Sequence, residues 1–251
     1  MNTGMKSVLA IFLAASSAAG QTEVKPAASA GAALPTADEV VDKYANAIGG
    51  KEAYEKLNSR LSKGTFELPA MGASGSIEMQ AKAPNKTISI IDIPGFGVIS
   101  RSYDGTTAWS QDPQTGIREL TGNELAIQKR GADFFQAVRL KELYPKREVK
   151  GKEKVGEREA YLVEAVPSEG GPVKMYFDTE NGFLTKIQLD VETPQGTLDV
   201  QTMLGDYKEV DGVKLPFTMR QVAGALEFVI KIQEVKHNVP IDDEKFKKPE
   251  K

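Results

Sequence analysis

The side chains that most often perform covalent or metal chemistry are scarce in this sequence. There is one histidine, His237, and there is no cysteine. Two-histidine metal sites, Cys/His pairs, thiolate nucleophiles and disulfides are therefore excluded. A Ser/His/Asp triad would have to use His237, which ends the last predicted strand beside Asn238 and a charged tail. At such a position a surface or edge histidine is the common case, so we do not expect it to be catalytic.

Other patterns that could bind phosphate or metal have simpler explanations. The G-x-S-x-G elbow of serine hydrolases does not occur. Asp242, Asp243 and Glu244 are adjacent, so they point apart on any regular element and do not match a calcium loop. Gly95 and Gly97 precede no predicted helix, which indicates a hairpin turn rather than a phosphate-binding loop. We therefore predict a protein that is not an enzyme and that needs neither cofactor nor metal.

Residues 1–20 have the pattern of a signal peptide. Lys6 is the only charged residue in the short first region, Ser7 to Ala19 is apolar and small, and Ala18-Ala19-Gly20 offers a cleavage site. The apolar run is shorter than the about 20 residues that span a membrane. An uncleaved amphipathic anchor is the alternative. Because the absence of cysteine excludes a lipobox, we expect a protein secreted to the periplasm without that kind of lipid anchor.

After the signal peptide, residues 21–35 predict a flexible tether, and residues 36–251 predict a single domain. The tether is rich in alanine, with threonine, lysine, serine and proline, and it has too few bulky apolar residues to pack. The remaining length suits one β-rich domain. The net charge of −3 comes from intermixed charges of both signs without a basic stripe, which argues against nucleic-acid binding.

Period-two alternation of apolar and polar residues predicts a long antiparallel meander from Ser59 onward. It is clearest in residues 196–238, where three strands follow one another and Asp211-Gly212 has the composition of a type I′ hairpin turn. We count about ten or eleven strands, with Gly116 to Leu120 as a marginal short one. An antiparallel sheet of this length curls toward a barrel.

Two helical segments are predicted, one before the alternating strands and one that interrupts them. The first begins at a cap formed by Thr36 or Asp38 and ends at Gly49-Gly50. The second is Thr121 to Tyr144, in which Thr121 and Glu124 have the spacing of a capping box. We therefore predict a mainly β fold with helices (α+β), namely a half-open antiparallel β-barrel of about ten or eleven strands. The N-terminal helix and the central helical insertion would cap this barrel.

The order of several segments resembles a known family. They are a first helix ending in Gly-Gly-Lys, a tryptophan-containing segment before the helical insertion, two late hairpins and a closing tail. Their sequences are AIGGKEAYEKLNSRLSKGTFE, YDGTTAWSQDPQTGIREL, MYFDTENGFLTKIQLD, YKEVDGVKLPFTMR and IQEVKHNVPIDDEKFKKP. Over residues 36–249 this order is similar to that of the periplasmic lipoprotein-carrier superfamily, the LolA/LolB-like fold, which includes outer-membrane lipoprotein-sorting proteins.

The resemblance implies an unclosed barrel whose apolar cavity shields the acyl chains of a lipoprotein or a similar lipid in the periplasm. It also implies an arginine that holds a lid shut, for which Arg101 and Arg118 are candidates by region. Acyl chains cost about 0.8 kcal/mol per methylene in water, so a carrier has to bury many of them. The implied partners are a lipid or acylated lipoprotein, with an inner- or outer-membrane protein as a further candidate, and we expect a monomer.

In this interpretation the ligand enters between the concave face of the sheet and the insertion helix. The apolar residues expected to line its site are Phe66, Met71, Met79, Ile91, Phe96, Trp109, Phe134, Phe135, Leu140, Phe217 and Phe228. Trp109 could instead fill the core, which is the commoner role of a tryptophan, and most of the methionines could do the same. Met71 differs from them because an apolar residue in its loop has less reason to be buried.

Two other functions are compatible with the same fold, because a fold does not dictate a function. One is an envelope-stress or assembly protein that binds a protein partner, which would need an exposed apolar patch outside the barrel. The other is an enzyme, which would need a cluster of polar groups inside the cavity. Arg101, Tyr103 and Gln111 are the few candidates for such a cluster.

Overall fold

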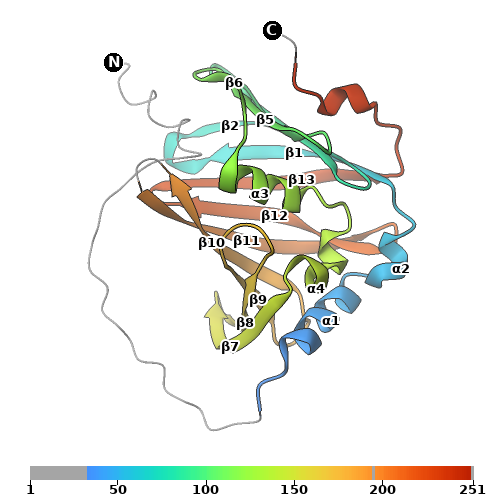
Figure 1. Cartoon of the computed structure of the whole chain (residues 1–251). Helices are drawn as coiled ribbons and strands as arrows, with labels where there is room; N and C mark the ends of the chain where they lie inside the picture. Colours follow the sequence, from blue (N-terminus) through green and yellow to red (C-terminus); the bar gives the residue numbers. More distant parts are fainter. Residues whose placement is uncertain (1–32, 194–195, 250–251) are drawn as a thin grey trace.

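The structure is a computed structural model, and it describes residues 33–193 and 196–249 (Figure 1). The predicted signal peptide and residues 21–32 of the predicted tether lie outside the described residues. Among the helices within the described ranges, none is long and apolar enough to cross a membrane.

Thirteen antiparallel strands of the described chain form one sheet. They are β1 (Ser59–Leu68), β2 (Ala73–Lys82), β3 (Lys86–Ile93), β4 (Gly97–Tyr103), β5 (Ala108–Asp112), β6 (Gly116–Glu119), β7 (Lys146–Val155), β8 (Arg158–Val166), β9 (Val173–Asp178), β10 (Leu184–Thr193), β11 (Gly196–Val210), β12 (Val213–Ala223) and β13 (Leu226–His237). Their order in the sheet is β6-β5-β4-β3-β2-β1-β13-β12-β11-β10-β9-β8-β7. The first strand thus pairs with the last, and the two edges, β6 and β7, are consecutive in the chain.

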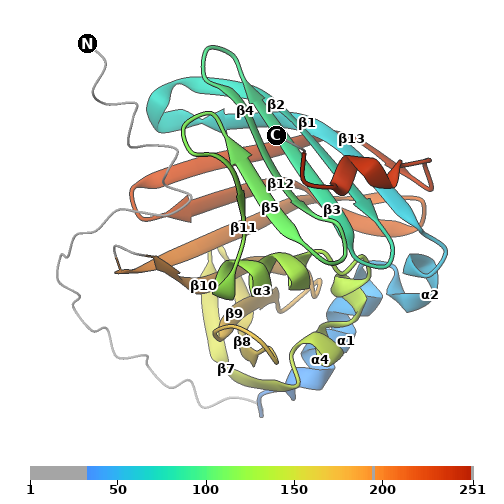
Figure 2. The ribbon, with the colours of Figure 1, turned by 45° about the horizontal axis from the view of Figure 1, so that its top comes forward.

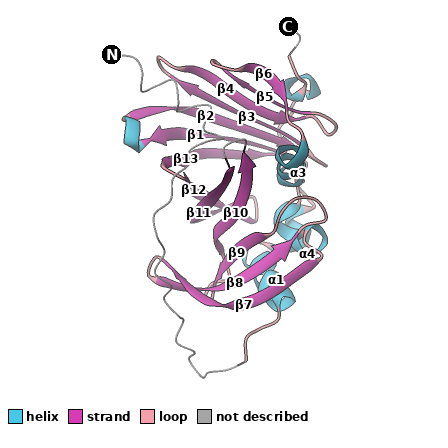
Figure 3. Ribbon diagram, turned by 60° about the vertical axis from the view of Figure 1, so that its left-hand side comes forward, coloured by secondary structure: helices cyan, strands magenta, loops and turns pink. Residues whose placement is uncertain are grey.

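The mainly β class with helices is confirmed, but the predicted number of strands is wrong. The predicted ten or eleven strands are too few, because even the short β5 and β6, of five and four residues, each pair with a neighbour. As expected of a half-open arrangement, the sheet is not closed into a barrel, since β6 and β7 each have a single paired neighbour among the described strands. It is a curved, open sheet (Figure 3).

Four α-helices and three short 3-10 helices accompany the sheet in the described residues. They are α1 (Ala37–Ala47), α2 (Gly50–Tyr54), η2 (Pro69–Met71), α3 (Gly122–Gly131), η3 (Gln136–Val138), α4 (Leu140–Leu143) and η4 (Asp243–Phe246). The segment α3–η3–α4 is the predicted insertion, and it carries the chain from one sheet edge, β6, to the other, β7. Helices α1, α3 and α4 lie together on one side of the curved sheet (Figures 1 and 3).

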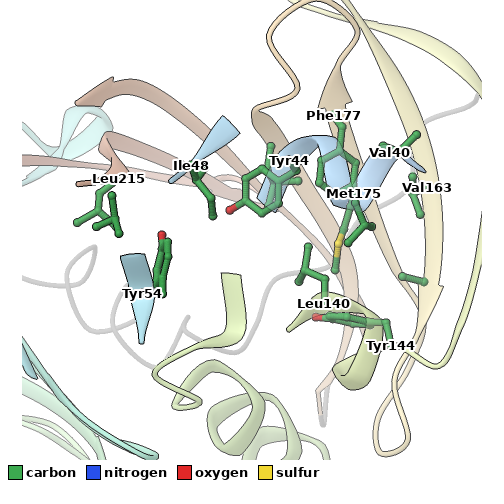
Figure 4. Close-up of a cluster of buried hydrophobic side chains, with 14 of the residues drawn as sticks. Val40, Tyr44, Ile48, Tyr54, Leu140, Tyr144, Val163, Met175, Phe177 and Leu215 are labelled. Carbon is green, nitrogen blue, oxygen red and sulfur yellow. The ribbon is translucent and has the colours of Figure 1, made fainter. Parts of the chain in front are cut away.

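Helix α1 supplies much of the main hydrophobic core. Its predicted cap is confirmed, because the Thr36 side chain accepts a hydrogen bond from the Glu39 amide and the Glu39 carboxylate accepts one from the Thr36 amide. Its inner face packs on strands β8, β9 and β12 and on the insertion (Figure 4). The ring of Tyr44, for example, lies 5.4 Å from that of Phe177, centroid to centroid. This packing fixes the insertion at the α4 end.

The turn between α1 and α2 is attached to the β11–β12 hairpin. The Lys214 amide donates a hydrogen bond of 2.8 Å to the Ile48 carbonyl. Gly49 follows with a φ of +116°, and a Cβ placed on it would lie 2.4 Å from the carbonyl oxygen of Gly212. This close approach of two backbones requires glycine.

We predict that Gly49→Ala destabilises the protein by at least about 2 kcal/mol more than Gly50→Ala, because only the first clashes with backbone. Gly50 is the matched control, since it also has a positive φ, +78°, but a Cβ placed on it would meet nothing within 4 Å. Its substitution should cost about 1 kcal/mol from the left-handed conformation alone. Urea denaturation would measure both values, and equal losses would show that the contact with Gly212 is not a constraint.

Candidate functional site

A cavity of about 390 Å³ lies between the sheet and α3, and we call it the larger cavity. Strands β1–β4, β12 and β13 and helix α3 contribute its lining. The residues are Arg60, Ser62, Met79, Gln80, Ala81, Thr87, Ile88, Ser89, Arg101, Ile127, Gln128, Gly131, Leu215, Pro216, Met219, Ile232 and Val235. Most of this surface is apolar, and the charged residues among the described lining are two arginines.

A second cavity of about 130 Å³, the smaller cavity, shares Arg101 and Ile127 with the larger one. Its wall is built mainly by aliphatic and aromatic side chains of β10–β13. The full lining is Arg101, Glu124, Ile127, Leu189, Val191, Leu198, Val200, Gln221, Ala223, Leu226 and Phe228. The two cavities therefore adjoin beneath α3.

The space beneath α3 follows from the small residues that face it. One cross-strand row pairs Ser62 with Met79, Met79 with Ser89, and Ser89 with Arg101. Paired residues point to the same face of a sheet, so this row presents two short serine side chains and one flexible methionine to the helix. Side chains of this size leave room that larger aliphatic residues would fill.

The same row continues through Ser110 to Arg118 on β6, which places two arginines on the face beneath α3. Both reach one carboxylate of the helix. The Arg118 guanidinium donates two hydrogen bonds of 2.8 Å to Glu124, and Arg101 Nη2 lies 3.4 Å from Glu124 Oε1. We call these three residues the clamp. It joins α3 to β4 and β6.

The contacts of the clamp show that the predicted capping box of α3 is wrong. Thr121 does precede the first residue of α3, but its side chain caps no amide, so the predicted capping box with Glu124 does not form. The Glu124 carboxylate is drawn to the arginines instead, because a bidentate guanidinium pair is stronger than a hydrogen bond to a backbone amide. The hydrogen bonds from Arg118 lower the pKa of Glu124 below its ordinary value, with burial opposing them.

His237 lies near the other end of the larger cavity, where its strand partner is Arg60. The prediction of a surface or edge histidine is wrong, because β13 is an inner strand and the side chain is 1% exposed. Its Nδ1 lies 2.9 Å from Asp211 Oδ2, while its Nε2 has no hydrogen-bond partner among the described residues. No serine therefore completes a triad there. Burial lowers the pKa of His237.

Two of the eleven predicted lining residues lie on the cavities: Met79 on the larger one and Phe228 on the smaller one. Phe66, Ile91 and Phe96 pack with Phe228 in a neighbouring apolar cluster of β1–β4 and β13. The rings of Phe66 and Phe228 are 5.2 Å apart. Phe228 thus connects this cluster to the smaller cavity.

The other predicted lining residues have different positions. Four pack into the main core with α1, namely Phe134, Phe135, Leu140 and Phe217. The C-terminal segment around η4 lies against β3 (Figure 2). Trp109 is buried, and its indole nitrogen donates a hydrogen bond of 2.9 Å to the Phe246 carbonyl of that segment. Met71 is exposed. None of these six lines either cavity.

The prediction missed the polar residues that line the larger cavity, above all Arg60. A signal for it was present, because Arg60, Ser62 and Phe66 alternate on one face of β1. Of the polar groups considered for an enzyme, Arg101 alone lines the larger or the smaller cavity, and the Tyr103 hydroxyl donates to the Gly105 carbonyl. The described residues include no group of three side chains that could hold a metal ion.

Comparison with known proteins gives matches at the level of structure. No protein-family model matches the chain, and no curated protein sequence matches it. A LolA superfamily protein from Nitrosomonas europaea superposes with a TM-score of 0.54 at 13% identity, over 86% of this chain and 99% of that one. A DUF1329 family protein from Desulfovibrio piger gives a TM-score of 0.55 at 12% identity, over 84% and 96%.

A third structure is described as a putative outer membrane lipoprotein-sorting protein domain from Vibrio parahaemolyticus. It superposes with a TM-score of 0.55 at 11% identity and covers 83% of this chain and 94% of that one. At these identities the comparisons bear on the fold. The chain has a LolA-like fold, as its segment order predicted.

Proposed function

We propose that this protein binds acyl chains of a lipid or lipoprotein in the cavities beneath α3. The observation that carries the proposal is the larger cavity itself, which adjoins the apolar wall of the smaller one. Its 390 Å³ falls within the range of about 300–1,000 Å³ typical of ligand sites. Each methylene moved from water into such a site gains about 0.8 kcal/mol, so a chain of ordinary length is bound without polar contacts.

The size of the larger cavity suits one acyl chain at a time. Its volume equals that of about 13 water molecules at about 30 Å³ each, and a methylene group is of similar size. A cargo with several chains would require α3 to move away from the sheet. The expected role in outer-membrane lipoprotein sorting, with export to the periplasm, is part of the same proposal and is supported by the likeness in fold to the sorting-protein domain.

In this proposal α3 is the lid, and the clamp holds it shut. Both arginines expected by region for this role contact Glu124 of α3. Their ion pairs are partly shielded, since the Glu124 side chain is 18% exposed, and they are therefore stronger than fully solvated ones. Ligand entry would break the clamp and lift α3.

The alternative, binding of a protein partner, has less support. It needs an exposed apolar patch, and the large exposed apolar side chains of the described residues are Leu34, Met71 and Val98. Three such residues are fewer than an interface core normally offers. The deciding experiment is mass spectrometry of the purified protein together with titration of a fluorescent fatty acid. If the purified protein carries no lipid and binds no acyl probe, the acyl-binding proposal is wrong and the partner-binding alternative remains.

We predict that Met79→Trp weakens fatty-acid binding about tenfold or more, because the indole occupies the larger cavity. Because the space is otherwise empty, the free energy of unfolding should change by less than about 1 kcal/mol. Val98→Trp is the control, since Val98 is exposed and lies on neither cavity. If the Met79 variant binds as well as the wild type, the ligand does not occupy this cavity.

We predict that Glu124→Gln speeds hydrogen exchange of the α3 amides and the release of bound fatty acid, because it removes both ion pairs of the clamp. Glu227→Gln provides a matched control, since Glu227 accepts two hydrogen bonds of 2.7 Å from Arg220 on exposed strand positions. Hydrogen–deuterium exchange and stopped-flow displacement would measure the two rates. Unchanged rates in the Glu124 variant would mean that the clamp does not hold the lid.

The clamp should also open at acid pH. The pKa of Glu124 is lowered in the folded protein, so the clamp is fully formed above the ordinary carboxyl pKa of about 4.3. It is lost as the pH falls through the lowered value. We expect the release of a fluorescent fatty alcohol, which has no ionisable headgroup, to accelerate in that acid range, and Glu124→Gln to remove the acceleration. A stopped-flow series from pH 7 to pH 3 would test this, and an identical pH profile for the variant would contradict it.

A further inference from the structure

Arg60 is an arginine of the larger cavity that the clamp does not use. It lies near the start of β1, between Ala81 of β2 and His237 of β13 in the sheet. No hydrogen bond or ion pair joins its guanidinium to any residue that the structure describes. Arg101, the other arginine of this cavity, is by contrast paired with Glu124. The charge of Arg60 thus faces a largely apolar space without a counter-ion.

The described residues around Arg60 provide no carboxylate that would neutralise its charge. The described lining of the larger cavity contains no carboxylate. The carboxylate of Asp211 lies 2.9 Å from the imidazole Nδ1 of His237 and is itself exposed. Burial lowers the pKa of Arg60, as expected where water is excluded around a cation. A partly buried, unpaired cation is destabilising, so its presence points to a ligand that pairs with it.

The two cavities together have the shape and polarity of an amphiphile site. The larger one carries Arg60 and the hydroxyl of Ser62, whereas the smaller one is walled by residues such as Leu198, Val200 and Phe228. They adjoin at Ile127 of the lid. A single-chain molecule could therefore place a polar group beside Arg60 and extend its tail beneath α3.

We propose that Arg60 binds the anionic headgroup, a carboxylate or phosphate, of a single-chain amphiphile whose tail lies beneath α3. This inference rests on the proposed function and adds a ligand class to it. Guanidinium groups pair with carboxylate and phosphate through two parallel hydrogen bonds, which suits either headgroup. An uncharged chain of equal length would leave Arg60 unpaired and would bind less tightly.

The test compares the wild type with Arg60→Gln and Arg60→Lys. Arg220→Gln, which removes an arginine from an exposed ion pair, is the matched control. The probes are dodecanoate, dodecyl phosphate, dodecanol and inorganic phosphate, with affinities measured by calorimetry. We expect Arg60→Gln to weaken binding of the two anionic amphiphiles about tenfold or more and to leave dodecanol unchanged. Arg60→Lys should retain part of the difference, and inorganic phosphate should not bind measurably.

The outcomes separate this inference from the proposed function. Equal losses for dodecanoate and dodecanol, or no loss for either, would overturn the headgroup role while acyl binding stands. If no chain-bearing probe binds the wild type, the proposed function fails as well. Tight binding of inorganic phosphate that depends on Arg60 would replace the amphiphile by a free anion.

Two further measurements do not depend on affinity. An unpaired cation destabilises the empty protein, so Arg60→Gln should melt at the same temperature as the wild type or higher; a lower Tm would assign Arg60 a structural role and overturn the inference. The charge of Arg60 also helps to lower the pKa of His237, the only histidine. Bound dodecanoate should therefore raise that pKa in an NMR titration of the wild type. No change on saturation would place the carboxylate elsewhere.

Discussion

The pairing of β1 with β13 determines where this sheet stays open. Because the first and last strands hydrogen-bond to each other, the two edges fall to β6 and β7, which are consecutive in the chain. The connection between them has to cross the open side, and here it does so as the helical insertion. This crossing places helix α3 over the concave face of the sheet. The cavities and the clamp follow from that crossing.

The size of the side chains that face the interior differs along the sheet. Toward α1 and α4, aromatic side chains such as Phe134 and Phe217 close the core. Beneath α3 the cross-strand row that faces the helix includes the short side chains of Ser62 and Ser89 and the flexible side chain of Met79. Close packing normally removes such space because each unfilled contact is lost stabilisation. An interior that remains open beneath α3 is what the proposed binding function requires.

The sequence predicted the parts of this arrangement that depend on local patterns. Alternation located the strands, and the α1 cap at Thr36 formed as expected. The prediction failed where contacts between distant parts of the sequence determine the local structure. Glu124 pairs with arginines that the sheet brings beneath α3, and it does not form the predicted capping box. Large aromatics were expected on the cavity because they are apolar, yet aromatics fill space, so residues such as Trp109 and Phe134 lie in packed clusters. The residues that line the larger cavity include small and polar ones, among them Arg60, which composition alone would assign to the surface.

An open sheet whose edges are joined only by a helical segment has a mechanical property that a closed barrel lacks. In a closed barrel the circumference is set by the number and stagger of its strands, so enlarging the interior means breaking ladder hydrogen bonds. Here the gap between β6 and β7 carries no ladder in the described chain. It can widen by bending of the sheet and sliding of the insertion, with every strand pair intact. The length of residues 120–145, rather than the strand pairing, therefore limits how far the interior could be enlarged.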